Sequence, residues 1–193
     1  MSRVRTRPTR DDTREKLFEA AARVFEERGI GAASIETIAA AAGFTRGAFY
    51  SNFASKDDLI VAMLEDHVER SLEHHRKLLA RHDNLTDFVA ALRATERSRH
   101  DPLGRAPLLH MELILYVARS EKRRPDLARR LRARRKMVTD IVATTAAEVR
   151  DPAWAGALVL ALEDGFRLHR LIDPDSTPAD SFFRAVADLQ KLA

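Results

Sequence analysis

The stretch SIETIAAAAGFTRGAFYSNFASKDDL, residues 34–59, constrains the fold more than any other part of the chain. Ser34 is a favoured N-cap, and apolar residues follow it at helical spacing. Gly43 ends this short helix, because the left-handed position after a helix C-terminus costs glycine nothing. Thr45 caps the next helix after only a few turn residues. The pattern therefore predicts two short helices joined by a tight turn, as in a helix-turn-helix.

The second of these helices has two distinct faces. Phe49 and Phe53 are four residues apart and should point into a small core. The opposite face carries a cation, a glycine and hydroxyl groups, at Arg46, Gly47, Tyr50 and Ser51. A helix that enters the major groove of DNA needs a long cation for base edges, hydroxyls for phosphates and a small residue at close approach. Glycine inside a helix costs about 1 kcal/mol relative to alanine, which indicates close approach rather than stability.

A third helix begins directly after this unit. Ser55 and Asp58 form the start of a capping box, and Lys56 lies in the first turn, where a phosphate could be reached. The alternative interpretation of the whole stretch is a small helical subdomain with ordinary caps and a solvated polar face.

In combination these residues resemble the N-terminal domain of the TetR/AcrR family of bacterial transcriptional regulators. The resemblance runs from Asp11 to Leu64. Its matching positions are Ala20, Ala21, Phe25, Gly29, Gly31, Ser34, Ile35, Ile38, Ala39, Ala42, Gly43, Thr45, Arg46, Gly47, Phe49, Tyr50, Phe53, Lys56 and Leu59. The segment 161–175 also resembles the penultimate helix of many members.

The resemblance implies an all-α fold and a set of DNA contacts. It predicts a helix-turn-helix domain at 11–55 and a ligand-binding and dimerisation domain at 56–193, preceded by a disordered basic arm at 1–10. The implied DNA-binding residues are Ser34, Thr45, Arg46, Gly47, Ala48, Tyr50, Ser51, Asn52 and Lys56. The sequence departs from the family at Glu36, where some members carry a basic residue that reads a base. A base contact from position 36 is therefore not carried over.

Composition narrows the remaining classes. The chain has 193 residues, a formal net charge of +4 and no cysteine, which excludes disulfides and thiolate metal sites. No apolar run of about 18 residues occurs, so no membrane span is predicted, and the N-terminus lacks the apolar core of a secretory signal. We therefore expect a cytoplasmic protein. The arm carries four arginines and no acid. It is expected either to follow the DNA backbone or enter a minor groove, or to serve as a solubilising tail.

Proline and glycine divide the chain into about nine predicted helices, and no strand pattern appears. Their ranges are 11–28, 35–41, 45–52, 56–80, 87–99, 106–119, 126–149, 153–171 and 178–192. In the basic run 121–136, Leu127 and Leu131 are expected to mark a buried stripe, with the arginines mostly on the solvated side.

The segment 108–117 is apolar almost all the way round, so it should be central to the second core. Glu112 interrupts it and is a candidate to face a ligand cavity, although such a residue is more often hydrogen-bonded to a neighbouring helix or faces the domain junction. Candidate pocket residues are Phe88, Leu92, Met111, Glu112, Leu115, Tyr116, Trp154 and Phe166. Ordinary core packing is the alternative for each of them.

The last two helices carry more apolar residues than a peripheral pair needs. Pairing with a second copy is the natural use, and the resemblance implies it as well. The candidate dimer residues are Leu158, Ala161, Leu162, Gly165, Phe182, Val186 and Leu189. A two-fold dimer would present two recognition helices to a pseudo-palindromic DNA site.

The sequence thus predicts a homodimeric DNA-binding transcriptional regulator, most simply a repressor released from its operator by a small, at least partly apolar molecule. No cofactor is expected. The histidines at 67, 74, 75 and 82 do not pair at metal-ligand spacing, and Glu163, Asp164 and His169 form no catalytic motif, so neither a metal site nor an enzyme is predicted. A constitutive DNA-architectural protein and a helical enzyme are the alternatives.

Overall fold

The structure is a computed structural model that describes residues 9–82, 84–95, 102–146 and 148–190, with the side chains at 85, 95, 189 and 190 outside that description. The basic arm predicted at 1–10 lies almost wholly outside it. Ten helices and no strand occur in the described part. They are α1 (Arg10–Ala32), α2 (Ile35–Ala41), α3 (Arg46–Tyr50), α4 (Lys56–Leu79), α5 (Leu85–Thr95), α6 (Pro102–Arg105), α7 (Pro107–Arg119), α8 (Arg124–Thr145), α9 (Pro152–Ile172) and α10 (Ser181–Gln190).

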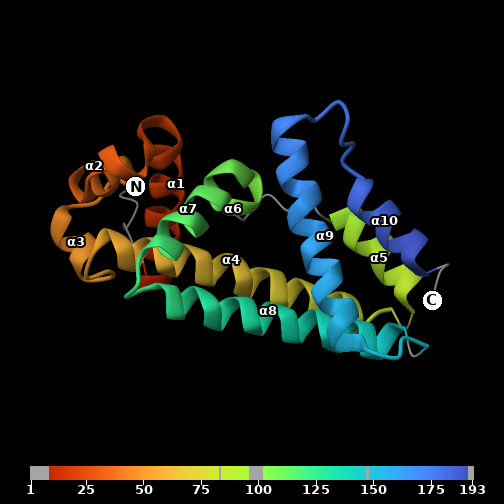
Figure 1. The fold of residues 1–193 in the computed structure, drawn as a ribbon. Coiled ribbons are helices and arrows are strands. Elements are labelled where there is room, and N and C mark those ends of the chain that lie inside the picture. Colours follow the sequence, from red (N-terminus) through yellow and green to blue (C-terminus); the bar gives the residue numbers. More distant parts are fainter. Residues whose placement is uncertain (1–8, 83, 96–101, 147, 191–193) are drawn as a thin grey trace, which may run out of the picture.

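The helices form a head and an elongated body (Figure 1). Helices α1 to α3 make the head. The long helices α4 and α8 lie side by side and run in the same direction, from the head along the whole body. Helix α9 packs on α8, α7 lies across α4 and α8, and α5 and α10 pair at the end of the body far from the head. None of the helices in the described ranges is long and apolar enough to cross a membrane.

The all-α prediction is confirmed, with some boundaries shifted. Helix α6 was not predicted, because four residues are too few to show helical periodicity. Helix α8 begins at Arg124 rather than 126, since Pro125 in the first turn removes an N–H that has no helical partner. Helix α10 begins at Ser181, three residues later than expected. Residues 96–99 of the helix predicted at 87–99 lie outside the described part.

The predicted caps of the head are confirmed. The hydroxyl oxygens of Ser34, Thr45 and Ser55 accept hydrogen bonds from the backbone N–H three residues on, at 3.1, 3.2 and 3.1 Å. Gly43 has φ of 74° and ends α2 in the left-handed region, as the sequence indicated. Gly29 has φ of 73° and ψ of 159°, and it breaks α1 where the helix was expected to end.

The head and the body share one apolar core. The ring of Phe53 packs against those of Phe18 and Phe49, and its centroid lies 5.7 Å from each of theirs. The same cluster continues through α4, whose residues 59–64 are all buried, to Leu113 on α7. A division between domains at residue 55 stays a prediction, because it cuts through this continuous core.

Helix α8 corrects one prediction. Leu127 packs against the shared core, as expected, but Leu131 is 47% exposed, whereas Arg130 is only 6% exposed. Arg123 and Arg130 donate to Asp58 and Glu65 of α4. The two arginines are seven residues apart in the sequence, and so are the two acids. Because α4 and α8 run in the same direction, each arginine lies opposite one acid. The hydrophobic pattern was right for Leu127 and wrong for Leu131, because the ion pair with Glu65 lets Arg130 occupy the buried side.

The α8–α9 contact depends on a glycine that the sequence did not single out. A Cβ at Gly156 would lie 3.0 Å from the backbone nitrogen and Oγ1 of Thr139 on α8. The two helix backbones therefore approach more closely here than a side chain would allow.

We predict that Gly156→Ala destabilises the protein by about 1–2 kcal/mol, because the overpacking penalty exceeds the gain of about 1 kcal/mol in helix propensity. Chemical denaturation followed by circular dichroism measures the change. Gly31→Ala is the matched control, since a Cβ there meets no atom within 4 Å. Equal stability of the two variants would contradict the prediction.

Candidate nucleic-acid interface

Helix α3 presents an open, polar surface. The side chain of Arg46 is 63% exposed, and Tyr50 is 44% exposed. Gly47 lies between them and is also exposed. A Cβ at Gly47 would meet only Thr45 Oγ1, at an ordinary 3.7 Å, so nothing within the protein requires glycine at this position. Packing within the protein therefore gives no reason for a glycine at this position.

The other small polar residues of the interface are engaged with the backbone. Ser34 and Thr45 cap their helices, as described above. Ser51 Oγ and Asn52 Nδ2 both donate to the carbonyl of Ala48, at 2.8 and 2.9 Å, while Asn52 Oδ1 is buried with no hydrogen-bond partner. These groups fix the ends of α2 and α3, and their predicted DNA contacts stay predictions.

Lys56 also has a structural function. Its ammonium group donates to the carbonyls of Ile30 and Ala33, at 2.7 and 2.9 Å. These carbonyls follow the break at Gly29 and precede the cap of α2. Lys56 therefore anchors the connection from α1 to α2, and its phosphate contact remains a prediction.

Arg46 is held by two neighbours on the same surface. Its Nη1 lies 3.0 Å from Glu36 Oε1 of α2, its Nη2 lies 3.4 Å from the Tyr50 hydroxyl, and its Cζ lies 5.4 Å from the centre of the Tyr50 ring. The hydrogen bond to Tyr50 and the charge of Glu36 raise the pKa of Arg46. The backbone N–H of Glu36, together with Arg46, lowers the pKa of the Glu36 carboxyl. Sequence reasoning missed this pair because only the α2–α3 geometry brings the two residues together.

The predicted ligand residues do not converge on one pocket. Glu112, Leu115 and Tyr116 line an open groove of about 280 Å³ on the outer face of α7, together with Ile30 and Arg119. The other five are distributed over three helices. Phe88 is buried between α4, α5 and α8 with Leu92 against it, Met111 and Phe166 are partly buried, and Trp154 is 68% exposed on α9.

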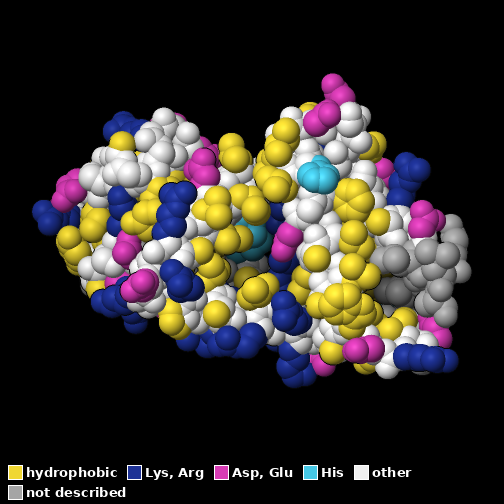
Figure 2. Space-filling view, in the orientation of Figure 1, with side chains coloured by type: hydrophobic (Ala, Val, Ile, Leu, Met, Phe, Trp, Pro, Cys, Tyr) yellow, Lys and Arg dark blue, Asp and Glu magenta, His cyan; other side chains and the backbone are white. Residues whose placement is uncertain are grey.

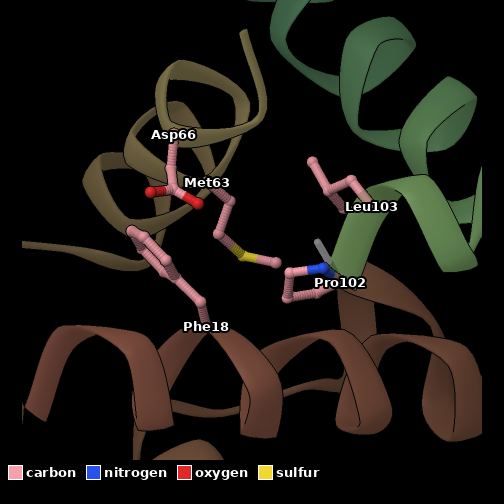
Figure 3. Close-up of a pocket in the computed structure, with 5 residues that line it drawn as sticks. All are labelled: Phe18, Met63, Asp66, Pro102 and Leu103. Atoms are coloured by element: carbon pink, nitrogen blue, oxygen red, sulfur yellow. The ribbon is translucent and has the colours of Figure 1, made fainter. Parts of the chain in front are cut away.

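A second crevice lies at the junction of α1, α4 and α6 (Figure 3). The side chain of Met63 extends toward Pro102 across it, while the Phe18 ring and the Asp66 carboxylate lie near each other on the opposite side. The crevice has no room for a water molecule, so it is a packing seam between head and body rather than a ligand site.

A polar network lies inside the body. Glu163 of α9 accepts from Arg134 of α8 at 2.7 Å and from Arg167 at 2.6 Å. Arg134 also reaches Asp164, at 3.2 Å. Arg167 Nη1 in turn lies 3.3 Å from Nδ1 of the buried His110 of α7. The network thus connects three helices of the body.

The network borders a hollow. Figure 2 shows a cleft between α7 and α9, with histidine at its floor and charged side chains on the α9 side. His110 stacks on His67 of α4, with ring centroids 4.3 Å apart. Burial acts to raise the pKa of Glu163, but Arg134 and Arg167 more than offset it, and the pKa lies below its usual range. Glu163 is therefore ionised at neutral pH, and the cleft wall is charged.

The body is also tied to the first turn of α4. The hydroxyl of Tyr116 donates to Asp57 Oδ1 at 2.9 Å, and Arg123 pairs with Asp58. Both acids lie immediately after the head, so these contacts tie α7 and the start of α8 to the point where α4 leaves the head.

The predicted dimer residues are mainly on α9. Leu158, Ala161, Leu162 and Gly165 are exposed or partly exposed there, and a Cβ at Gly165 would meet no atom of the chain within 4 Å. Phe182 of α10 is partly buried, and Val186 is only 6% exposed because α10 packs against α9 and α5. The side chain of Leu189 lies outside the described part.

Comparison with known proteins supports the interpretation of the head. The sequence profile of the family described as "Bacterial regulatory proteins, tetR family" matches residues 17–63. The probable HTH-type transcriptional regulator ArpR of Pseudomonas putida is 38% identical over 80 residues, which is 38% of each chain. The chain thus aligns with well under half of that relative's length.

Two solved structures share the fold of the whole chain. A putative transcriptional regulator from Pseudomonas aeruginosa superposes with a TM-score of 0.75 and 21% identity, covering 96% of this chain and 92% of that one. SmeT, the repressor of a multidrug efflux pump of Stenotrophomonas maltophilia, was solved with triclosan; it gives a TM-score of 0.68 and 23% identity, covering 92% and 89%. Residues 17–63 thus match the helix-turn-helix domain of the tetR family of bacterial regulatory proteins, and the chain as a whole shares the all-α fold of solved transcriptional regulators.

Proposed function

We propose that the protein is a transcriptional repressor that binds a pseudo-palindromic operator as a homodimer and is released by a small molecule. The observation that supports DNA binding is the surface of α3. Arg46 and Tyr50 flank a glycine whose missing side chain has no purpose inside the protein. A DNA backbone or base edge could therefore come directly against the helix at Gly47.

The test of this surface is Gly47→Ala. Because the position is open, the variant should fold normally and gain up to about 1 kcal/mol of helix stability. Its affinity for the operator should nevertheless fall at least about tenfold, or about 1.4 kcal/mol, since the methyl group prevents close approach. Thermal denaturation and gel shifts on the upstream DNA of its own gene measure the two effects.

Gly31→Ala, which is equally open but away from α3, controls for general effects of the substitution. Unchanged operator binding by Gly47→Ala would refute the assignment of this surface.

The proposed homodimer is supported by an apolar stripe on α9. The stripe follows alternating steps of four and three residues, which keeps it on one side of the helix. Trp154, Leu168 and Ile172 on it are 68, 43 and 75% exposed. Its members are Trp154, Leu158, Ala161, Gly165, Leu168 and Ile172. A second copy of α9 related by a two-fold axis would cover this stripe and place two α3 helices on one side of the dimer.

We predict that Leu168→Glu together with Ile172→Glu converts the protein to a monomer, because the symmetric contact would bring like charges together in an apolar seam. Light scattering after size exclusion measures the mass. Leu131→Glu is the matched control, since Leu131 is 47% exposed on α8, away from the stripe. A double variant that stays dimeric would refute the α9 interface.

The proposed release by a small molecule is supported by the cleft between α7 and α9. Ligand sites usually bury most of the ligand and offer a few fixed polar groups. The cleft combines depth with the Glu163–Arg167–His110 chain of contacts, whereas the groove at Glu112 is shallow and open. A ligand that inserts here would separate Arg167 from His110 and let α7 move against α4.

Such a movement reaches the head through Tyr116 and Arg123, which hold Asp57 and Asp58 in the first turn of α4. In a dimer, a small tilt of each α4 changes the separation of the two heads. Both half-sites can then no longer be occupied together. To switch the protein, the effector must prefer the DNA-incompetent state by a few kcal/mol.

We predict that a screen of aromatic carboxylic acids and phenols yields compounds that release the operator, and that Arg167→Met weakens their effect about tenfold or more, because the variant removes the cationic donor. Fluorescence anisotropy of labelled operator measures release. Arg170→Met is the control, an exposed arginine on the same helix. Release unaffected by Arg167→Met would move the site elsewhere, and no release by any compound would favour a constitutive DNA-binding protein.

A further inference from the structure

The pair Glu36–Arg46 lies at the centre of the proposed DNA surface. Glu36 is in the first turn of α2, Arg46 is the first residue of α3, and the atoms Oε1 and Nη1 are 3.0 Å apart. The two side chains are 56% and 63% exposed. An ion pair this exposed contributes little to folding, because water screens it and both side chains lose freedom. Stability therefore does not account for an acid on a surface that faces DNA phosphates.

The pair does fix the direction of the arginine. Glu36 holds Nη1, while the Tyr50 hydroxyl and ring hold Nη2 and the guanidinium plane from the other side. A guanidinium has five N–H donors, and these contacts use one on each terminal nitrogen. One N–H on each terminal nitrogen, together with Nε–H, stays available. Arg46 can therefore make a bidentate contact without first being ordered, which reduces the entropy lost on binding.

Glu36 brings an acceptor beside these donors. In the major groove, guanine presents the acceptors O6 and N7, which match arginine, and cytosine presents the N4 amino donor, which matches a carboxylate. Thymine O4 and guanine O6 are acceptors and would repel the carboxylate. The two side chains of the pair thus have complementary partners in neighbouring guanine and cytosine.

We propose that Glu36 is a specificity-determining residue, which accepts from the N4 amino group of a cytosine beside the guanine that Arg46 contacts. The same carboxylate repels phosphates and cancels the charge of Arg46, so that the pair offers no net positive charge to random DNA. Non-specific binding rests on phosphate contacts, so Glu36 weakens it while strengthening the preference for one base. This inference rests on the proposed DNA-binding function.

The test uses the full-length protein, its footprinted operator and duplexes in which each operator base is replaced singly. For wild type, replacing the critical cytosine should lower affinity about tenfold or more for thymine or guanine, and least for adenine, whose N6 is also a donor. Glu36→Gln keeps the shape of the side chain but can turn its amide either way. It should reduce this discrimination to less than about threefold and raise affinity for unrelated DNA.

Glu148→Gln is the control for net charge, because Glu148 is exposed between α8 and α9, far from the head. It should change neither base preference nor non-specific affinity. The unfolding midpoint of Glu36→Gln should match wild type, so altered binding cannot be attributed to misfolding.

The outcomes distinguish failure of the proposed DNA-binding function from failure of the inference about Glu36. If wild type selects no sequence, the proposed DNA-binding function fails. If wild type selects its operator and Glu36→Gln keeps the same preference at every position, only the inference about Glu36 is overturned.

Discussion

Helix α4 is the element on which the rest of the structure depends. Residues 59–64, near its start, are buried in the core that also contains Phe49 and Phe53 of the helix-turn-helix. Its remaining turns form the long axis against which α7 and α8 pack. Because one rigid helix belongs to both parts, the position of α3 is coupled to the packing of the body. No flexible linker separates them.

Ion pairs and hydrogen bonds inside the body fix how its helices are aligned with α4. Apolar contacts between helices tolerate small sliding movements, whereas hydrogen-bonded ion pairs hold a defined register. Arg123, Arg130 and Tyr116 fix α4 to α7 and α8 at set positions along its length. The network around Glu163 does the same between α8, α9 and α7. Buried charges add little to stability on balance, so these pairs define the register of the helices more than they stabilise the fold.

The proposed DNA surface contains two kinds of polar residue, those that hold the backbone and those that face outward. Ser34, Thr45 and Lys56 use their polar groups to hold the backbone of α2 and α3 in place. Three exposed residues, Glu36, Arg46 and Tyr50, are then arranged by that backbone into one cluster. Residues that build the surface and residues that face outward are therefore largely different, although all were expected from sequence to touch DNA except Glu36.

Local sequence determined the helix-turn-helix almost completely. Its caps, its glycine stop at position 43 and its buried phenylalanines act within a few residues of each other, so spacing alone predicts them. Only the tertiary structure decided which face of α8 is buried, where Lys56 points, and that Glu36 meets Arg46. These outcomes depend on partners 10 to 65 residues away, such as Glu65 for Arg130 and Ile30 for Lys56. Hydrophobic periodicity cannot report them, because a charge that finds an opposite charge at the interface occupies a position that the pattern assigns to an apolar residue.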